Sequence, residues 1–367
     1  MSLHRQAGTR VGTPLSRRQF LHRGAVAGAA LAAFGGLGVR NARAASGGTV
    51  VVRTPGGSVE DTYRKAIWEP FTAATGIQVE NYTANAAKVE AMIQSGRIGL
   101  DVLDIAESLA LLLQHRGSLA PLPASTFRLT DAHDLQIMTD RYAGEYTYSA
   151  VIGYNTNAFP TKPPSSYADV WNVADFHGPR TLEDLSVDVG VLEGALLADG
   201  VPTSKLYPLD VDRAFRKLRE IRKDVVKFWT SAAVPAEMLT NKDAVIGTIP
   251  ANRAIVLQKA GAPVGFTWNQ AAIESQVLCV LKGAPNLENA YKYIDFALQP
   301  KQQAAIAQMA GFGPLNRKAF NYLTPAQTRD LPTSPLHLRE GFFINMRWWF
   351  DNRPEVLKRW QSFMLGG

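Results

Sequence analysis

The chain has 367 residues, 39 of them basic and 32 acidic, which gives a formal net charge of +7. Seven arginines and no acidic residue fall within residues 1–44, so the remaining 323 residues carry 32 charges of each sign. The composition beyond residue 44 therefore predicts no nucleic acid or anionic membrane as a partner. Its length predicts two domains. A single cysteine, Cys279, excludes an internal disulfide, and its apolar neighbours indicate a buried, inert thiol.

The first part of the chain has the pattern of an export signal. Arg17 and Arg18 precede an apolar stretch, residues 24–39, that holds no acidic residue, and the motif Ala-Arg-Ala that signal peptidases accept follows. Paired arginines favour the twin-arginine pathway, which exports folded proteins. An uncleaved membrane anchor is the alternative, but the apolar stretch is short for a bilayer span. We expect residues 1–44 to be removed and the mature protein to work in the periplasm.

Beyond the signal, short β-branched runs alternate with longer helical patterns, which is typical of an α/β protein with largely parallel sheets. Residues 49–53, 77–82 and 102–105 are expected to be strands. A helix is expected between the first two strands. It begins at Ser58, because the string Ser-Val-Glu-Asp has the form of a capping box, and it ends at Gly76.

The second half of the chain shows the same alternation. Its predicted strands are 225–229, 245–248, 264–268 and 276–281, and its predicted helices are 211–221 and 286–298. The aromatic segment 342–350 reads Phe-Phe-Ile-Asn-Met-Arg-Trp-Trp-Phe. We expect this segment to fill a core, and a surface for a partner protein is the alternative.

Motifs of catalysis are missing from the sequence. There is no Gly-x-Ser-x-Gly elbow, no His-Glu-x-x-His, no phosphate-binding Gly-Lys-Ser/Thr and no glycine-rich dinucleotide fingerprint. No two of the four histidines beyond residue 45 lie within four residues of each other, so metal-ligand spacing is also missing. The sequence therefore predicts a binding protein without a cofactor or metal, and not an enzyme.

Several short strings, in order along the chain, carry a family resemblance. They are Gly56-Gly57-Ser58, Glu69-Pro70-Phe71, Thr75-Gly76-Ile77-Gln78-Val79, Gly153-Tyr154-Asn155-Thr156-Asn157, residues 195–201, residues 206–210, Trp268-Asn269-Gln270, residues 282–286, and Gly313-Pro314 with Asn316. The chain resembles extracellular solute-binding proteins of the spermidine/putrescine type, which are the periplasmic receptors of ABC importers. The strings extend over residues 49–320, nearly all of the chain beyond the signal.

The resemblance implies a type II periplasmic binding protein, with two α/β lobes, crossing hinge strands and a ligand cleft between the lobes. One lobe would comprise residues 45–152 and 276–312, and the other residues 153–275 and 313–367. The expected crossings are Val151 to Asn155 and Gln276 to Val280. Such a receptor closes on a small solute and then docks on a membrane permease with its ATPase. A monomer is the default expectation.

Candidate ligand-binding residues follow the ends of the predicted strands. Gly57 and Ser58 lie where the first strand gives way to a helix, so backbone N–H groups would face the cleft, although an ordinary capped turn explains them equally well. Further candidates near strand ends are Glu107, Ser108, Ser149, Trp229 and Trp268. The two tryptophans suit aromatic walls, and a place in the core is the alternative for each.

The remaining candidates decide the charge of the expected solute. Glu274 stands where related sequences carry an acid after the string 268–270. Gln276 stands where they carry a second acid, so that acid is missing here. Gln270, within the string, is also a candidate. The related string Trp-Asn-Gly-Arg reads Pro-Ala-Asn-Arg here, so Arg253 is kept while an aromatic wall is lost. A polyamine receptor would use carboxylates and aromatic faces, whereas an arginine suits a carboxylate or phosphonate.

Four hypotheses follow. The first is an exported receptor for an amine-bearing solute, polyamine-like or otherwise. The second is a receptor for an anionic or zwitterionic solute such as an amino acid, opine or phosphonate. The third is an exported enzyme on the same scaffold. The fourth is a partner-binding module that uses the aromatic segment.

Overall fold

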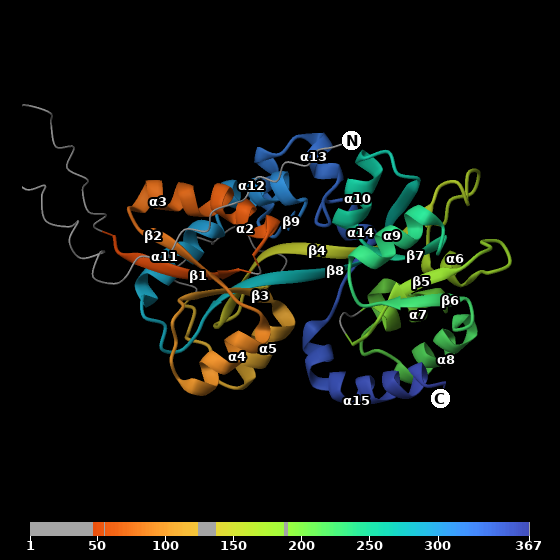
Figure 1. The fold of residues 1–367 in the computed structure, drawn as a ribbon, viewed down its shortest axis with the longest axis horizontal. Coiled ribbons are helices and arrows are strands. Elements are labelled where there is room, and N and C mark those ends of the chain that lie inside the picture. Colours follow the sequence, from red (N-terminus) through yellow and green to blue (C-terminus); the bar gives the residue numbers. More distant parts are fainter. Residues whose placement is uncertain (1–46, 55, 124–136, 187–189, 367) are drawn as a thin grey trace, which may run out of the picture. The chain divides into compact units, whose positions relative to one another are not determined.

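The structure is a computed structural model, and it describes residues 47–54, 56–123, 137–186 and 190–366. The predicted export signal lies outside these residues. Residues 45–367 form one compact unit, shown in Figure 1. No helix in the described part of the chain has both the length and the apolarity needed to cross a membrane.

In the described residues, the unit is built on one mixed sheet of ten strands. Along the sheet the strands follow the order β2 (Gln78–Thr83), β1 (Thr49–Thr54), β3 (Val102–Ala106), β8 (Val264–Val280), β4 (Tyr142–Asn155), β7 (Ile246–Pro250), β5 (Arg180–Glu183) and β6 (Val225–Trp229). Two short strands pair at the side: β9 (Gly313–Pro314) with β4, and β10 (Phe342–Phe343) with β8.

Strand directions divide the sheet into three parts. At one end β2, β1 and β3 are parallel, and at the other end β7, β5 and β6 are parallel. The long strands β4 and β8 lie between these groups and are antiparallel to each other and to the neighbouring strands β7 and β3. Two parallel α/β groups are therefore joined through one pair of antiparallel strands, which run across the middle of the unit in Figure 1.

Helices cover both faces of each parallel group (Figure 1). In the first group they are α2 (Ser58–Tyr63), α3 (Glu69–Thr75), α4 (Ala86–Ser95) and α5 (Glu107–His115), with a π-helical turn at Arg64–Trp68 between α2 and α3. In the second they are α6 (Tyr167–Trp171), α7 (Val191–Ala198), α8 (Val211–Ile221), α9 (Ala233–Asn241) and α10 (Ala251–Lys259). The last part of the chain forms α11 (Leu287–Ala297), α12 (Pro300–Ala310), α13 (Pro325–Arg329), α14 (His337–Glu340) and α15 (Met346–Met364), and Thr203–Lys205 and Arg317–Tyr322 are 3₁₀ helices.

Most of the predicted elements are confirmed to within two residues at each end, but one prediction is wrong. The strands expected at 264–268 and 276–281 are a single strand, β8, of 17 residues. The sequence between them looks like a break because its polar residues interrupt the apolar pattern. In the structure this stretch pairs with β4, whose register shifts between Ala150 and Ile152, opposite the left-handed residue Gln270 (φ 61°).

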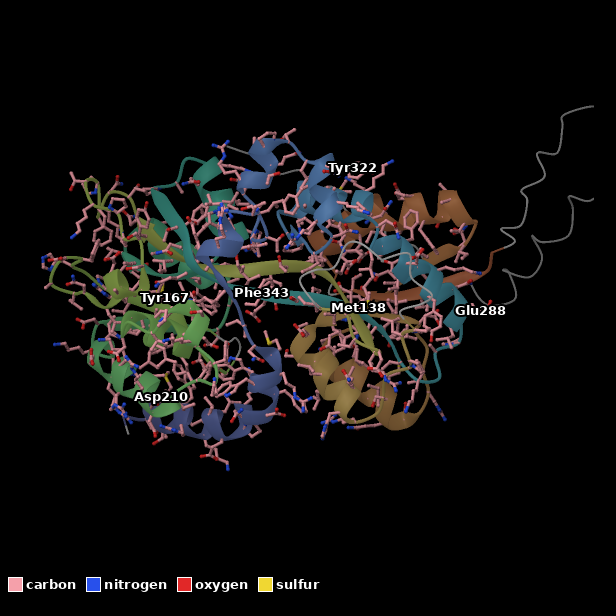
Figure 2. All side chains as sticks on the ribbon, turned by 180° about the vertical axis from the view of Figure 1, so that it is seen from behind. Met138, Tyr167, Asp210, Glu288, Tyr322 and Phe343 are labelled. Carbon is pink, nitrogen blue, oxygen red and sulfur yellow. The ribbon has the colours of Figure 1, made fainter. Side chains whose placement is uncertain are left out.

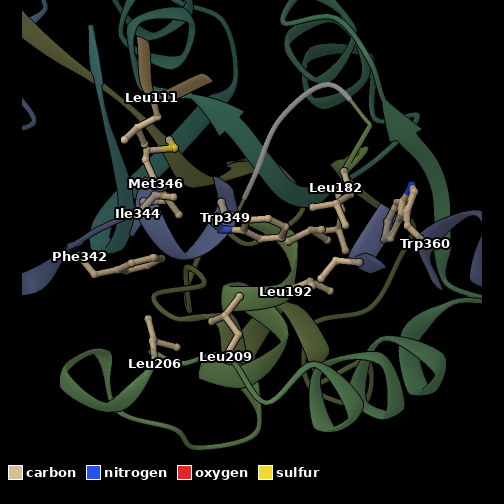
Figure 3. Close-up of a cluster of buried hydrophobic side chains, with 14 of the residues drawn as sticks. Leu111, Leu182, Leu192, Leu206, Leu209, Phe342, Ile344, Met346, Trp349 and Trp360 are labelled. Atoms are coloured by element: carbon tan, nitrogen blue, oxygen red, sulfur yellow. The ribbon is translucent and has the colours of Figure 1, made fainter. Parts of the chain in front are cut away.

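The aromatic segment 342–350 enters the core, as predicted, through Phe342 and Trp349, which are 8% and 2% exposed. Along α15 the buried residues recur at helical spacing: Met346, Trp349, Val356, Trp360 and Phe363. Figure 3 shows Trp349 and Trp360 packed with Leu182 and Leu192. The last helix is thereby fixed against β5 and α7.

The close contact between β7 and β5 at Gly247 can be tested by substitution. A Cβ atom at this position would lie 1.7 Å from the carbonyl oxygen of Thr181 on β5. We expect Gly247→Ala to force the two strands apart and to lower the free energy of unfolding by about 3 kcal/mol. Thermal denaturation would show this as a melting temperature roughly 5 °C lower. Gly99→Ala is the matched control, since a Cβ there meets no atom within 4 Å, and equal effects of both variants would contradict the packing.

Candidate functional site

A cavity of about 750 Å³ lies between α5, α15 and the long strands β4 and β8. Its polar lining comes from Ser108, Tyr148, Glu274 and Arg353, and its aromatic lining from Trp349 and Phe350. The volume is in the range of small-molecule sites, which are mostly apolar with a few polar groups that orient the ligand. Four structural elements distant in sequence thus build one candidate ligand site.

The crossing strands supply the floor of this cavity. Tyr148 on β4 and Glu274 on β8 are directly opposite each other in the register, so their side chains lie on the same face. The Tyr148 hydroxyl lies 3.4 Å from Oε2 of Glu274. Glu274 is only 7% exposed. Because Glu274 lines the cavity, its carboxylate can attract a cationic group of a ligand.

The wall opposite α5 is the first half of α15. Asn345 caps this helix by accepting a hydrogen bond from the backbone N–H of Trp348. Trp349, Phe350 and Arg353 then project from the first two turns into the cavity lining. The guanidinium of Arg353 also donates hydrogen bonds of 3.3 Å to the carbonyl oxygens of Leu185 and Ser186, which follow β5. The helix is therefore tied to the loop beyond a strand end.

Glu107 and Ser108 begin α5 directly after β3. Ser108, which the sequence predicts to bind ligand, is part of the cavity lining. Glu107 instead accepts a hydrogen bond of 3.3 Å from the Tyr142 hydroxyl. Burial raises the pKa of the Glu107 carboxyl, and the Tyr142 hydrogen bond lowers it in part. The two neighbours thus have different surroundings.

Gln276 follows Glu274 on the same strand face, opposite Ala106 and Tyr146. Close to the Gln276 amide is the first of two buried acids, Asp104 and Glu145, both 0% exposed. Burial raises the pKa of Asp104 to about 6, while the Gln276 amide, the Arg53 charge and the Tyr63 hydroxyl lower it. Burial and the charge of Asp104 hold the pKa of Glu145 well above its usual range, although the Tyr63 hydroxyl donates to it.

A second concavity, of about 440 Å³, lies between α2, α10, α12 and α13. Arg253 lines it from the first turn of α10 together with Thr62 of α2 and Phe312. Phe312 stacks on Tyr146, with ring centroids 4.4 Å apart. Lys259 of α10 bridges this concavity through an ion pair with Asp330, 3.3 Å away. Arg253 and Glu274 therefore line different concavities, and the structure does not bring them together.

The other predicted ligand-binding residues have mostly structural surroundings. Trp229 is buried, 3% exposed, and its indole N–H donates to the Thr248 carbonyl oxygen at 3.1 Å. Trp268 is stacked on His337 with ring centroids 4.2 Å apart. The side-chain oxygen of Gln270 accepts a hydrogen bond of 2.7 Å from the backbone N–H of Tyr167. These three residues hold strands and helices in place.

Of the last three predicted ligand-binding residues, Gly57 and Ser58 lie at the start of α2, and Ser149 is buried. Gly57 has φ 65° and is exposed at the start of α2, a conformation that favours glycine. Ser58 is the first residue of α2, and its side chain lies outside the described part of the structure. Ser149 is 4% exposed, and its hydroxyl has no hydrogen-bonding partner among the described residues. None of the described acids, histidines and cysteine form a group that could hold a metal ion.

The aromatic and cationic wall of the cavity was not predicted from the sequence. Trp349 and Phe350 were expected in a core, and Tyr148 and Arg353 were not ligand-binding candidates. A signal for Tyr148 existed, because a strand running from Tyr142 places it two residues from Tyr146 on one face. Arg353 gave no signal, since only the packing of α15 against α5 brings it to the site.

The comparisons with known proteins place the chain in a family. Residues 66–333 match the model of the bacterial extracellular solute-binding protein family. A γ-aminobutyric acid-binding protein of Pseudomonas aeruginosa is 29% identical over 335 residues, which cover 89% of this chain and 94% of that protein. A spermidine/putrescine-binding periplasmic protein of Escherichia coli is 26% identical over 197 residues, 53% of this chain and 55% of that protein.

Comparison with solved structures leads to the same family. The structure of an ABC transporter substrate-binding protein from Bradyrhizobium japonicum superposes with a TM-score of 0.81 at 32% identity, covering 86% of this chain and 99% of that one. The fold is that of a type II periplasmic binding protein, and the chain belongs to the bacterial extracellular solute-binding protein family. It is a solute-binding component of an ABC transporter and works outside the cytoplasm, as the resemblance of its sequence implied.

The buried acid pair makes the stability of this receptor depend on pH. The pKa of Asp104 is about 6 in the folded protein and 3.8 in a free side chain, so between those values the folded state binds more protons than the unfolded state. The free energy of unfolding therefore falls as pH rises through this window. Asp104→Asn should remove the cost and raise the melting temperature at pH 7.5, with little gain at pH 4.

The control for this variant is Asp243→Asn, since Asp243 is exposed and its carboxyl is free of the buried pair. Denaturant unfolding of all three proteins from pH 4 to pH 8 measures the effect. Parallel stability curves for the unmodified protein and the Asp104→Asn variant would show that the carboxyl does not titrate in this window.

Proposed function

We propose that this protein is the receptor for a small zwitterionic solute, one that carries an amine at one end and a carboxylate at the other. The observation that carries the proposal is the Glu274 carboxylate, 7% exposed, in a cavity that also contains Arg353. Groups of opposite charge in one cavity match a ligand with two opposite charges. The Pseudomonas aeruginosa relative is named for γ-aminobutyric acid, a solute of this kind.

The amine would bind at the floor. The carboxylate of Glu274 and the hydroxyl of Tyr148, 3.4 Å apart, are both acceptors for an ammonium group. Trp349 and Phe350 line the same cavity, and a cation over such a ring gains about 0.5 to 2 kcal/mol. These are the carboxylate and aromatic surroundings expected for any amine-bearing solute, so the floor alone fits a polyamine as well.

Arg353 is the residue that favours a zwitterion over a polyamine. A second ammonium group would be repelled by the guanidinium, whereas a carboxylate would be attracted to it and could accept two parallel hydrogen bonds. Arg253, which is exposed in the second concavity, is the alternative carboxylate partner that the sequence suggested. It would act on a longer solute that reaches from one concavity to the other.

Capture would proceed by closure of two lobes on the solute. We propose the division into residues 45–152 with 276–312 and residues 153–275 with 313–367. The two parallel strand groups joined through β4 and β8 support it. The ligand would bind the closed form better and shift the population toward it. We further propose export by the twin-arginine pathway to the periplasm, a monomeric state, and binding without chemical change, metal or cofactor.

Four solutes with the same four-carbon chain test the ligand class by isothermal titration calorimetry. They are γ-aminobutyrate, putrescine, butyrate and succinate. We expect γ-aminobutyrate to bind most tightly, because it alone satisfies both Glu274 and Arg353. Tighter binding of putrescine would establish a polyamine receptor instead, and tighter binding of succinate would establish an anion receptor.

Glu274→Gln tests the amine site directly. The variant keeps the side-chain size but removes the charge, so we expect the affinity for γ-aminobutyrate to fall at least tenfold, about 1.4 kcal/mol. Glu288→Gln on α11 is the matched control, since Glu288 is exposed (Figure 2). Equal affinities of the two variants would place the amine elsewhere.

A further inference from the structure

A buried glutamate on α7 contacts the aromatic wall of the cavity from behind. Glu193 is 0% exposed and lies in the first turn of α7. Its Oε1 accepts a hydrogen bond of 2.7 Å from the indole N–H of Trp349, and the Tyr207 hydroxyl donates to the same oxygen. Its second oxygen, Oε2, has no hydrogen-bonding partner among the described residues. One carboxyl oxygen therefore holds two aromatic side chains.

The two donors come from different parts of the chain. Tyr207 lies between the 3₁₀ helix Thr203–Lys205 and α8, while Trp349 lies on α15. Trp348 closes the group, with its ring 5.9 Å from Tyr207 and 5.2 Å from Trp349, the latter at an interplanar angle of 88°. Figure 3 shows Trp349 in the middle of the apolar cluster, with Leu192, the neighbour of Glu193, beside it.

Burying a carboxyl group in such a place lowers the stability of the folded protein, so we ask what its hydrogen bonds do for the site. Burial disfavours its charged form, and among the described residues neutral donors offset this: the Tyr207 and Trp349 side chains and backbone N–H groups. Apolar residues around Trp349 would pack its ring equally well but would not fix its rotation. A hydrogen bond to the indole N–H does fix it, because the N–H must point at the acceptor.

We propose that Glu193 is a positioning residue for the ligand site: by accepting the indole N–H of Trp349 it sets the orientation of the ring that lines the solute cavity. This inference rests on the proposed function, since it assigns Trp349 to the binding of the solute. Glu193 does not line the cavity itself and acts on the solute only through Trp349. The tyrosine bond keeps the acceptor oxygen in place from the other side.

Two variants of Glu193 separate its hydrogen bond from its bulk. Glu193→Leu removes both oxygens, so we expect the affinity for γ-aminobutyrate to fall about tenfold. Glu193→Gln retains one acceptor oxygen, so we expect it to restore the affinity to within about threefold of the unmodified protein. Glu237→Gln on α9, where the glutamate is exposed, controls for a general effect of the change. Equal loss in the leucine and glutamine variants would overturn the proposal.

A double-mutant cycle tests whether the effect passes through Trp349. Trp349→Phe keeps a ring in the wall but removes the N–H donor, so Glu193→Leu should cost no further affinity in that background. A purely structural role of Glu193, exerted through Tyr207, would leave the same tenfold loss in the phenylalanine background, and that result would overturn the proposal.

A ligand-free readout keeps this inference distinct from the proposed function. In ¹H–¹⁵N spectra the Trp349 indole signal is identified by its disappearance in Trp349→Phe. It should be protected from hydrogen exchange in the unmodified protein and in Glu193→Gln, and exposed in Glu193→Leu. Unchanged protection in the leucine variant would overturn the positioning role. Absence of γ-aminobutyrate binding in every protein, with the expected exchange pattern, would reject the proposed ligand class and leave the hydrogen bond to Trp349 established.

Discussion

The antiparallel pairing of β4 with β8 is the interaction on which the rest of the structure depends. These two strands remain paired from Tyr142 opposite Cys279 to Asn155 opposite Val264, and they join one parallel strand group to the other. The same pairing places Tyr148 against Glu274 at the middle of the unit. A connection between two halves of the fold is therefore also the floor of the candidate ligand site.

Buried acids surround this floor in three different environments. Glu274 faces a cavity, Asp104 and Glu145 are fully buried, and Glu193 supports an aromatic wall. Burial disfavours the charged forms of Asp104, Glu145 and Glu193. Of these four acids, Glu274 lines the cavity of the candidate ligand site.

The last helix, α15, lines the cavity and is also hydrogen-bonded to the second strand group. Side chains of α15 hydrogen-bond to the segment after β5 at three points, through Trp349 to Glu193, Arg353 to Leu185 and Ser186, and Trp360 to Asp184. The first turns of the same helix face α5, where Phe350 lies 5.3 Å from the His115 ring. One helix thus holds a loop of the second strand group and faces a helix of the first.

The sequence by itself determined the α/β class, most element boundaries, the family, and two residues of the cavity, Ser108 and Glu274, because hydrophobic periodicity and local strings are properties of neighbouring residues. It did not join β8 into one strand, since pairing with a distant strand overrides a broken apolar pattern. It also predicted that Trp229 and Gln270 bind ligand, and in the structure both make hydrogen bonds to remote backbone groups. Only the tertiary structure brought Tyr148, Trp349 and Arg353 to the site, because packing between residues some 200 positions apart leaves no mark in a short stretch of sequence.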